Sequence, residues 1–242
     1  MNNKLRRSAL LAEAYTKGGE FDIDNYLTIV ALEDGLTAAL SGNTVEYCVD
    51  GDGNWKSLAS NTNSESINKG QTLSFRGNLT PDSSKGVGTF KISKSCDLTG
   101  NCNSLLFGDD AVNNNSLGNK AYAFYKLFYN CSTIKNVSSN FLPATTLANF
   151  CYYCMFQRCT SLTTAPELPA KTLVSSCYAR MFYGCSKLNY IKALFTTTPA
   201  SIYTSAWVSG VASSGIFVKS KNATWNVTGT DGIPSGWTVQ TA

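Results

Sequence analysis

The sequence predicts a multi-domain chain: an N-terminal helix, an antiparallel β-sandwich, and a short solenoid with one helix and one strand per repeat, closed by a β-structured C-terminal cap. Three observations lead to this fold class. A segment of helix-forming residues ends at Gly18-Gly19, β-branched and aromatic runs separated by turn residues follow it, and one apolar pattern then recurs three times. We place the four parts at residues 1–20, 21–110, 111–200 and 201–242.

Residues 3–17 form the predicted helix. Asn2 or Asn3 is the expected N-cap, and good helix formers continue through Ala14. A helix of this length is marginal in water on its own, so it must pack on another surface. It is either a surface helix folded back on its own domain or an anchor that attaches the protein to a larger assembly. The residues expected to form that anchor are Leu5, Arg6, Arg7, Leu10 and Leu11.

The β-sandwich is predicted from short runs of β-branched and aromatic residues. These runs cover residues 27–32, 36–40, 45–49, 72–75 and 89–92. Asp50 to Asn54 fits a hairpin turn between the strand at Val45 and a strand containing Trp55, since glycine adopts the positive φ that such turns need. The same turn resembles a calcium loop. Asn61 stands where an EF-hand requires a bidentate glutamate, so we expect no calcium site.

Two cysteines near the end of this part, Cys96 and Cys102, flank a turn-rich loop. They form either a disulfide or two free thiols. Residues 104–110 are predicted to be the last strand, and residues 112–120 a polar junction.

The second half of the chain contains three copies of one unit, which begin at Ala123, Cys151 and Cys177. The steps between these starting points are 28 and 26 residues, within the range of leucine-rich repeats. Apolar residues recur at offsets 0, +1, +4, +5 and +8, which we interpret as one face of a short helix. The columns expected to form the repeat core contain Phe128, Cys131 and Ile134 in the first copy, Phe156, Cys159 and Leu162 in the second, and Phe182, Cys185 and Leu188 in the third.

The residues after each predicted helix favour a short strand and a loop, because prolines interrupt them. In the second copy these residues are Leu162, Ala165 and Leu168, with Pro166 and Pro169. One unit cannot bury its own apolar face, so the copies must stack and the stack needs a cover at each end. The β-domain can cover the front and residues 201–242 the back. In that cap we interpret three tryptophans as packing residues rather than as a ligand platform: Trp207, Trp225 and Trp237.

The composition argues against several classes of function. Histidine is absent and the nine cysteines include a single CxxC pair, Cys151 and Cys154, so we expect neither a metal nor a cofactor. We also expect no enzyme, since the carboxylate pairs at residues 50 and 52 and at residues 109 and 110 fit turns. The net charge of +4 comes from scattered basic residues, so no nucleic-acid partner is expected. We find no membrane-spanning run and no secretory signal of sufficient length, and expect no membrane partner.

The segment from Cys151 to Ala170 strongly resembles the BspA-like leucine-rich repeat, a unit common in Bacteroidales surface proteins and their phages. The closing stretch from Trp207 to Gln240 is similar to the C-terminal end that such phage proteins carry. The resemblance covers residues 104–242 closely and the β-domain more loosely. This chain has only three repeats, and its last copy has Leu194-Phe195 in place of the Leu-Pro pair. The family has no catalytic residues to carry over.

The resemblance implies a virion fibre or decoration protein of a crAss-like or other Bacteroides phage, on the head or the tail. We expect it to be made in the bacterial host cytoplasm and to lie on the virion surface. Its partners would be other virion proteins, bound through the N-terminal helix, further copies of itself in a homo-oligomer, and a host-surface glycan or protein. The alternative is a secreted or cell-surface bacterial adhesin of the BspA-like class. Specificity should lie in residues that vary between copies, such as Arg158 against Gly184.

Overall fold

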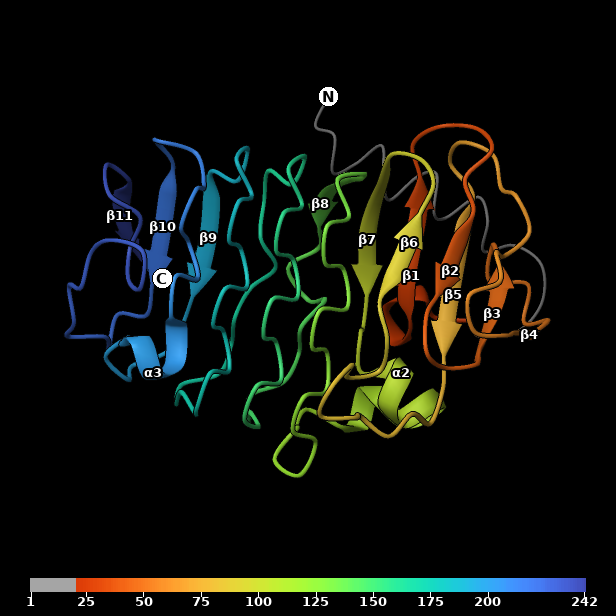
Figure 1. Ribbon diagram of the computed structural model, residues 1–242, viewed down its shortest axis with the longest axis horizontal. Coiled ribbons are helices and arrows are strands. Elements are labelled where there is room, and N and C mark those ends of the chain that lie inside the picture. Colours follow the sequence, from red (N-terminus) through yellow and green to blue (C-terminus); the bar gives the residue numbers. More distant parts are fainter. Residues whose placement is uncertain (1–20) are drawn as a thin grey trace.

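The structure is a computed structural model that describes residues 21–242. The helix predicted at residues 3–17, with its anchor residues, lies outside the described residues. Strands stand side by side along the long axis of the molecule, from β4 at one end to β11 at the other, and the repeat coils lie between β8 and β9 (Figure 1).

The N-terminal half is organised by a six-stranded sheet in the order β4-β3-β5-β1-β7-β8. All neighbouring strands in it are antiparallel except β7 and β8, which are parallel. A separate antiparallel pair joins β2 and β6. The strand bounds are β1 Leu27–Ala31, β2 Ala38–Leu40, β3 Val45–Val49, β4 Lys56–Leu58, β5 Thr72–Arg76, β6 Phe90–Ile92, β7 Cys96–Gly100 and β8 Ile134–Val137.

The predicted antiparallel sandwich is wrong, because the main sheet is mixed. Its edge at β7 does not end the domain but pairs in parallel with β8, which belongs to the first repeat. Backbone groups at an unpaired edge need partners, and the first repeat supplies them. The sheet therefore continues from the β-domain into the repeats.

Two local predictions in this region are also wrong. The loop expected between Cys96 and Cys102 is strand β7, whose Asp97 accepts a hydrogen bond from Asn136 at 2.7 Å. Pairing on both sides, with β1 and β8, outweighs the weak β propensity of these residues. The strand expected at residues 104–110 is instead helix α2, Ser104–Phe107, followed by the 3-10 helix η2, Gly108–Asn113. The Ser104 hydroxyl accepts from the Leu27 N–H and donates to the Phe75 carbonyl, which fixes α2 against the sheet.

The hairpin predicted at Asp50 is confirmed. β3 and β4 pair antiparallel, with Tyr47 opposite Lys56, and Gly51 in the turn has a φ of 64°. Trp55 lies just before β4 rather than inside it.

The repeat segments contain no helices. The predicted solenoid of helix-plus-strand units is therefore wrong; the two α-helices among the described residues, α2 and α3 (Ser201–Thr204), both lie outside the repeats. In each copy every fourth residue has a positive φ, as at Phe150, Cys154 and Arg158 in the second. A left-handed residue cannot continue an α-helix. The chain therefore advances in steps of four residues rather than 3.6 per turn.

Hydrogen bonding explains this geometry. In the second copy alternate N–H groups bond within the copy, as Tyr153 N–H does to the Phe150 carbonyl at 3.2 Å. The N–H groups between them bond to the third copy, as Cys154 N–H does to the Ala179 carbonyl at 3.0 Å. An isolated helix would satisfy all of these groups internally. Here half of them hold neighbouring coils together, and so the copies depend on one another.

Apolar side chains inside the coils form continuous columns. Phe128, Phe156 and Phe182 stack with ring centroids 5.5 and 5.9 Å apart, and Phe90 of β6 extends the column at 5.5 Å from Phe128. The nine cysteines are buried free thiols, so Cys96 and Cys102 form no disulfide. The repeat-core residues of the three copies are all buried: Phe128, Cys131, Ile134, Phe156, Cys159, Leu162, Phe182, Cys185 and Leu188.

The C-terminal end is a parallel sheet in the order β11-β10-β9. Its strands are β9 Tyr190–Ala193, β10 Ile216–Lys219 and β11 Thr238–Thr241. The three tryptophans of this region are buried, and their indole N–H groups donate to carbonyls of other segments: Trp207 to Gly232, Trp225 to Phe195 and Trp237 to Ala212. Burial with a satisfied indole is the environment of a packing residue.

Candidate binding surface

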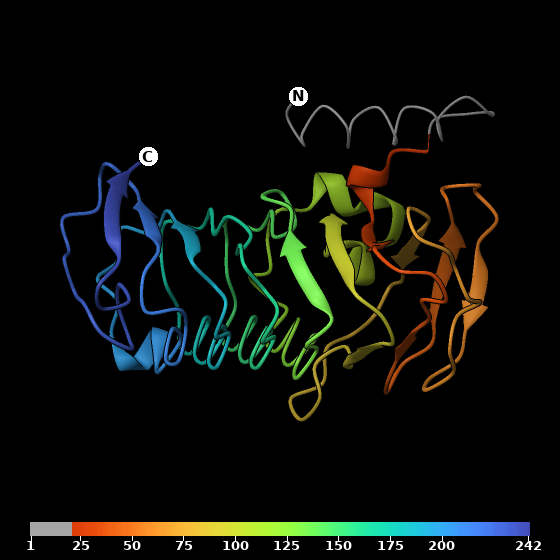
Figure 2. The same cartoon turned by 90° about the horizontal axis from the view of Figure 1, so that it is seen from above.

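The four-residue step decides which side chains of the repeats reach solvent. Two residues of each step face the core, and the half-buried or exposed side chains come from the other two. The turns form a row along one edge of the molecule, opposite the edge that carries β8, β9 and β10 (Figure 2). The side chains on this row that are half-buried or exposed include Tyr122, Tyr125, Lys126, Tyr129, Asn130, Phe150, Tyr153, Arg158, Ser176, Arg180 and Tyr183.

Four of these rings form a group that we call the aromatic quartet: Tyr122, Tyr125, Phe150 and Tyr153. Tyr122 stacks on Phe150 at 4.8 Å with an interplanar angle of 1°, and Tyr125 stacks on Tyr153 at 5.4 Å and 15°. Tyr122 and Phe150 also contact their neighbours within each copy, at 5.9 and 5.8 Å. The rings are held by coil stacking, so they are ordered before any ligand arrives.

The stack of rings stops at the third copy. In the columns of Phe150 and Tyr153, this copy carries the small residues Ser176 and Ala179. The ring contacts of Phe150 and Tyr153 within residues 21–242 are all to other quartet members, on the side of the first copy and within their own. Their faces toward the third copy are therefore not covered by another ring.

Three cations accompany the quartet, and we call Lys126, Arg158 and Arg180 the cation group. The Lys126 ammonium lies 4.9 Å from the Tyr125 ring centroid and 5.6 Å from that of Tyr129, within range of a cation–π interaction. Its interaction with the Tyr125 side chain raises the pKa of Lys126, which keeps the charge fixed. None of the ion pairs formed within residues 21–242 involves a member of this group.

Two of these cations, Lys126 and Arg180, occupy the column of Cys154 in the first and third copies. Burial raises the pKa of the Cys154 thiol to about 11, and the charges of Lys126 and Arg180 oppose that rise. Burial also raises the pKa of Tyr153, again against Arg180 and Lys126. Lys126 and Arg180 therefore lie in the copies on either side of Cys154, the residue next to Tyr153.

A loop of the β-domain borders the quartet on the side of the first copy. Asp82 and Gly86 close this loop with reciprocal backbone hydrogen bonds of 3.0 and 2.7 Å. A Cβ atom on Gly86 would lie 2.8 Å from the Tyr122 carbonyl oxygen and 3.0 Å from Tyr125 Cβ, so the loop packs directly on the quartet. Figure 2 shows it in dark yellow, projecting past the row of turns.

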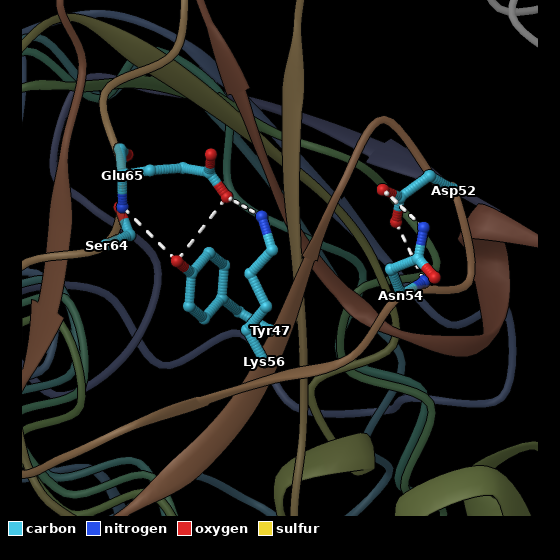
Figure 3. A network of polar contacts seen from close by, with 6 residues as sticks. All are labelled: Tyr47, Asp52, Asn54, Lys56, Ser64 and Glu65. Carbon is cyan, nitrogen blue, oxygen red and sulfur yellow. Dashed lines mark hydrogen bonds and ion pairs between the residues drawn. The ribbon is translucent and has the colours of Figure 1, made fainter.

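The polar residues of the β3–β4 hairpin form a different kind of site (Figure 3). Lys56 bonds to Glu65 at 2.5 Å on the exposed surface, and Tyr47 lies beside this pair. Asp52 accepts from the backbone and side-chain N–H groups of Asn54 at 2.9 and 3.2 Å. These carboxylates are engaged in turn and ion-pair contacts, which is the structural role expected of hairpin residues.

Asp109 belongs to a cluster of polar and aromatic side chains in the β-domain. It accepts from Arg76 at 2.8 and 2.9 Å and from the Tyr26 hydroxyl at 2.8 Å, while the Arg76 guanidinium lies 4.2 Å from the Trp55 ring centroid. Burial, together with the hydrogen bond to Asp109, raises the pKa of Tyr26 to about 12. The cluster links β1, β5 and η2.

Other candidate sites are sparse in the described part of the chain. No group of three or more His, Cys, Asp or Glu side chains within residues 21–242 is placed to hold a metal ion. A hollow at the C-terminal end is lined by residues 208–213 with Gly229, Thr230, Pro234 and Ser235, and none of these has an ionisable side chain. Within residues 21–242 there is no helix with both the length and the apolar character needed to cross a bilayer.

One residue of the binding surface, Arg158, was predicted from the sequence as a position that varies between copies. The aromatic quartet was not predicted, although its rings occur at the same two offsets in the first and second copies: Tyr122, Phe150, Tyr125 and Tyr153. The stacking of the first copy on the second brings the four rings together.

Comparison of the chain with known protein families, curated proteins and solved structures finds no match. The resemblance to the BspA-like repeat therefore stays a prediction.

Proposed function

We propose that this chain is a non-enzymatic attachment protein of a phage virion, which displays its row of turns toward the host surface. The observation that carries the proposal is the aromatic quartet with its cations, a preformed patch on the outside of the stacked repeats. Aromatic rings and arginine are the side chains that most often dominate recognition surfaces.

The architecture supports a display role. Each coil is bonded to the next through backbone groups, so the outward side chains keep fixed positions relative to one another. Placement on a virion, on head or tail fibres, rests on the resemblance of residues 151–170 to the BspA-like repeat. In this proposal residues 1–20 bind other virion proteins, and several copies act together so that weak contacts add up.

Immunogold labelling tests the proposal. An antibody raised against the full chain is applied to particles released from the bacterial cells that express it, and in parallel to the intact cells. Gold on the particles is the expected result. Gold on the surface of uninfected intact cells would refute the virion assignment and support the alternative, a secreted or cell-surface bacterial adhesin. Absence of label from both would refute surface attachment.

The anchor can be tested in the full-length chain. Replacing Leu10 and Leu11 together by Asp should abolish incorporation into particles, because charged residues cannot bury an apolar contact. Incorporation at the level of the unmodified chain would refute the anchor role. Replacing Val239, an exposed residue of β11, by Asp is the matched control and should leave incorporation unchanged.

A further inference from the structure

We propose that the aromatic quartet and the cation group bind a carboxylated glycan, with a sugar ring against the solvent-accessible parts of the Phe150 and Tyr153 rings and its carboxylate at Arg180. This inference rests on the proposed attachment function and names the class of its ligand.

The apolar part of the proposed recognition comes from the place where the stack of rings ends, at the third copy. On the side of the third copy no ring stacks on Phe150 or Tyr153, because their columns continue there with Ser176 and with the buried Ala179. On the far side of Ser176 lies Ile202, whose carbonyl accepts the Ser176 N–H at 2.7 Å and whose residue surface is 58% exposed. The solvent-accessible side chains here, Phe150, Tyr153 and Ile202, are largely apolar. The C–H face of a pyranose ring matches such a surface, since it is apolar while its hydroxyl groups point sideways into water.

The charge of the surface selects an anionic ligand. Lys126, Arg158 and Arg180 form no ion pair within residues 21–242. Arg158 lies across the third copy, where its Cγ is 3.4 Å from the place of a Cβ on Gly184. Arg180 directly follows Ala179, the residue that occupies the Tyr153 column in the third copy, and the Cys154 N–H next to Tyr153 donates to the Ala179 carbonyl at 3.0 Å. A guanidinium binds a carboxylate through two parallel hydrogen bonds, so a uronate-type sugar stacked on Tyr153 would meet its counter-charge there.

An acidic peptide would satisfy the charges but not the rings. Its side chains are flexible and its backbone amides need hydrogen-bond partners, while the N–H and carbonyl groups of the turns are used between the coils. A carbohydrate needs no such backbone partners. The pairing of ordered rings with unpaired cations therefore favours the acidic glycan.

The test measures binding of defined polymers to the purified full-length chain by biolayer interferometry. The probes are an oligogalacturonate, the same oligosaccharide with its carboxyl groups reduced, and oligoglutamate of equal charge. We expect the oligogalacturonate to bind at least about tenfold more tightly than either of the others, and added salt to weaken it. No binding of oligogalacturonate, or equal binding of oligoglutamate, would overturn the proposal.

Variants separate the two contributions. Tyr153→Ala should weaken oligogalacturonate binding by about tenfold through lost stacking, and Tyr153→Phe should retain it. Arg180→Gln should lower affinity by about tenfold and flatten the salt dependence. The matched controls are Tyr190→Ala in β9, on the opposite edge of the molecule (Figure 2), and Lys221→Gln, an exposed cation after β10. Unchanged binding by Tyr153→Ala, or equal losses in the controls, would refute the assigned site.

Circular dichroism and urea midpoints of each variant show whether it is folded, and Tyr153→Phe keeps the test valid if the alanine variant is not. The particle labelling is independent of these measurements. Labelled particles without glycan binding would overturn the ligand class alone, whereas unlabelled particles would overturn the attachment function.

Discussion

Replacing Gly184 by Ala should destabilise the protein by about 1 kcal/mol, although the same change in a helix would stabilise it by a similar amount. Gly184 has a φ of 72° and occupies the last of the three left-handed positions of the third copy. The Cβ atom would have space, since its nearest neighbours are Arg158 Cγ at 3.4 Å and Arg158 Cα at 3.9 Å. The substitution therefore tests the backbone conformation and almost nothing else.

The expected change in the free energy of unfolding combines two effects of the Gly184→Ala substitution. An L-residue in the left-handed region costs about 1–2 kcal/mol. Loss of glycine's freedom in the unfolded chain returns about 0.4–1 kcal/mol. The difference leaves the folded state about 1 kcal/mol weaker. In a helix the first effect is absent and alanine is favoured by about 0.8–1 kcal/mol, so the sign alone distinguishes the two backbones.

Urea unfolding followed by tryptophan fluorescence measures the change, from the shift in midpoint at constant slope. Gly118→Ala is the matched control. Gly118 is exposed, has no positive φ, and its added Cβ would make ordinary contacts at 3.5 and 3.7 Å. This control should be neutral or slightly stabilising. A stabilised Gly184→Ala protein would show that the four-residue step is not the conformation of the repeats.

Three further predictions follow from buried and charged groups. Phe156→Ala should lower the free energy of unfolding by about 4 kcal/mol in urea titrations, because it removes a ring stacked on both sides; a loss below about 1 kcal/mol would contradict its core role. Tyr178→Phe should be neutral or stabilising by about 1 kcal/mol, since its buried hydroxyl has no hydrogen-bond partner and Phe124 fills this column in the first copy; a clear destabilisation would reveal a partner. Burial raises the pKa of the Asp109 carboxyl, but hydrogen bonds from Tyr26 and Arg76 outweigh it and lower the pKa below its usual value. The stability that Asp109 contributes is thus present at neutral pH and lost as the pH falls below about 4. Asp109→Asn should reduce this acid-dependent loss in urea midpoints compared between pH 7 and pH 3, and an unchanged loss would exclude the carboxylate as its source.

The limits of sequence reasoning are clearest in the repeats. Apolar offsets of 0, +1, +4, +5 and +8 fit a helix of 3.6 residues per turn over two turns, and they fit a four-residue step equally well. Arg158, Arg180 and Cys154 are residue types that occur in helices, and none of them favours a positive φ. Gly184 and Asn130, which share one column, are the residue types that favour it. The choice depends on hydrogen bonds to the neighbouring coil, which are contacts between residues about 26 positions apart.

The β-domain gives a second example. Strong local patterns, as in residues 45–49 and 72–75, identify strands β3 and β5. Strand β7 has the sequence Cys-Asp-Leu-Thr-Gly, which is typical of a turn. It becomes a strand because β1 and β8 pair with it on both sides. Local composition does not reveal a pairing partner such as β8, which belongs to the first repeat.

By itself the sequence determined the steps of 28 and 26 residues between the three copies, and the columns of aromatic and cysteine residues that are buried, because burial follows hydrophobic spacing. The tertiary structure alone decided the path of the backbone through each repeat and the continuation of the sheet into it. It also brought Tyr122, Tyr125, Phe150 and Tyr153 together as one surface beside the cations. The physical reason is that half of the N–H groups in these turns bond to another coil, so the conformation of one copy exists only when its neighbour is in place.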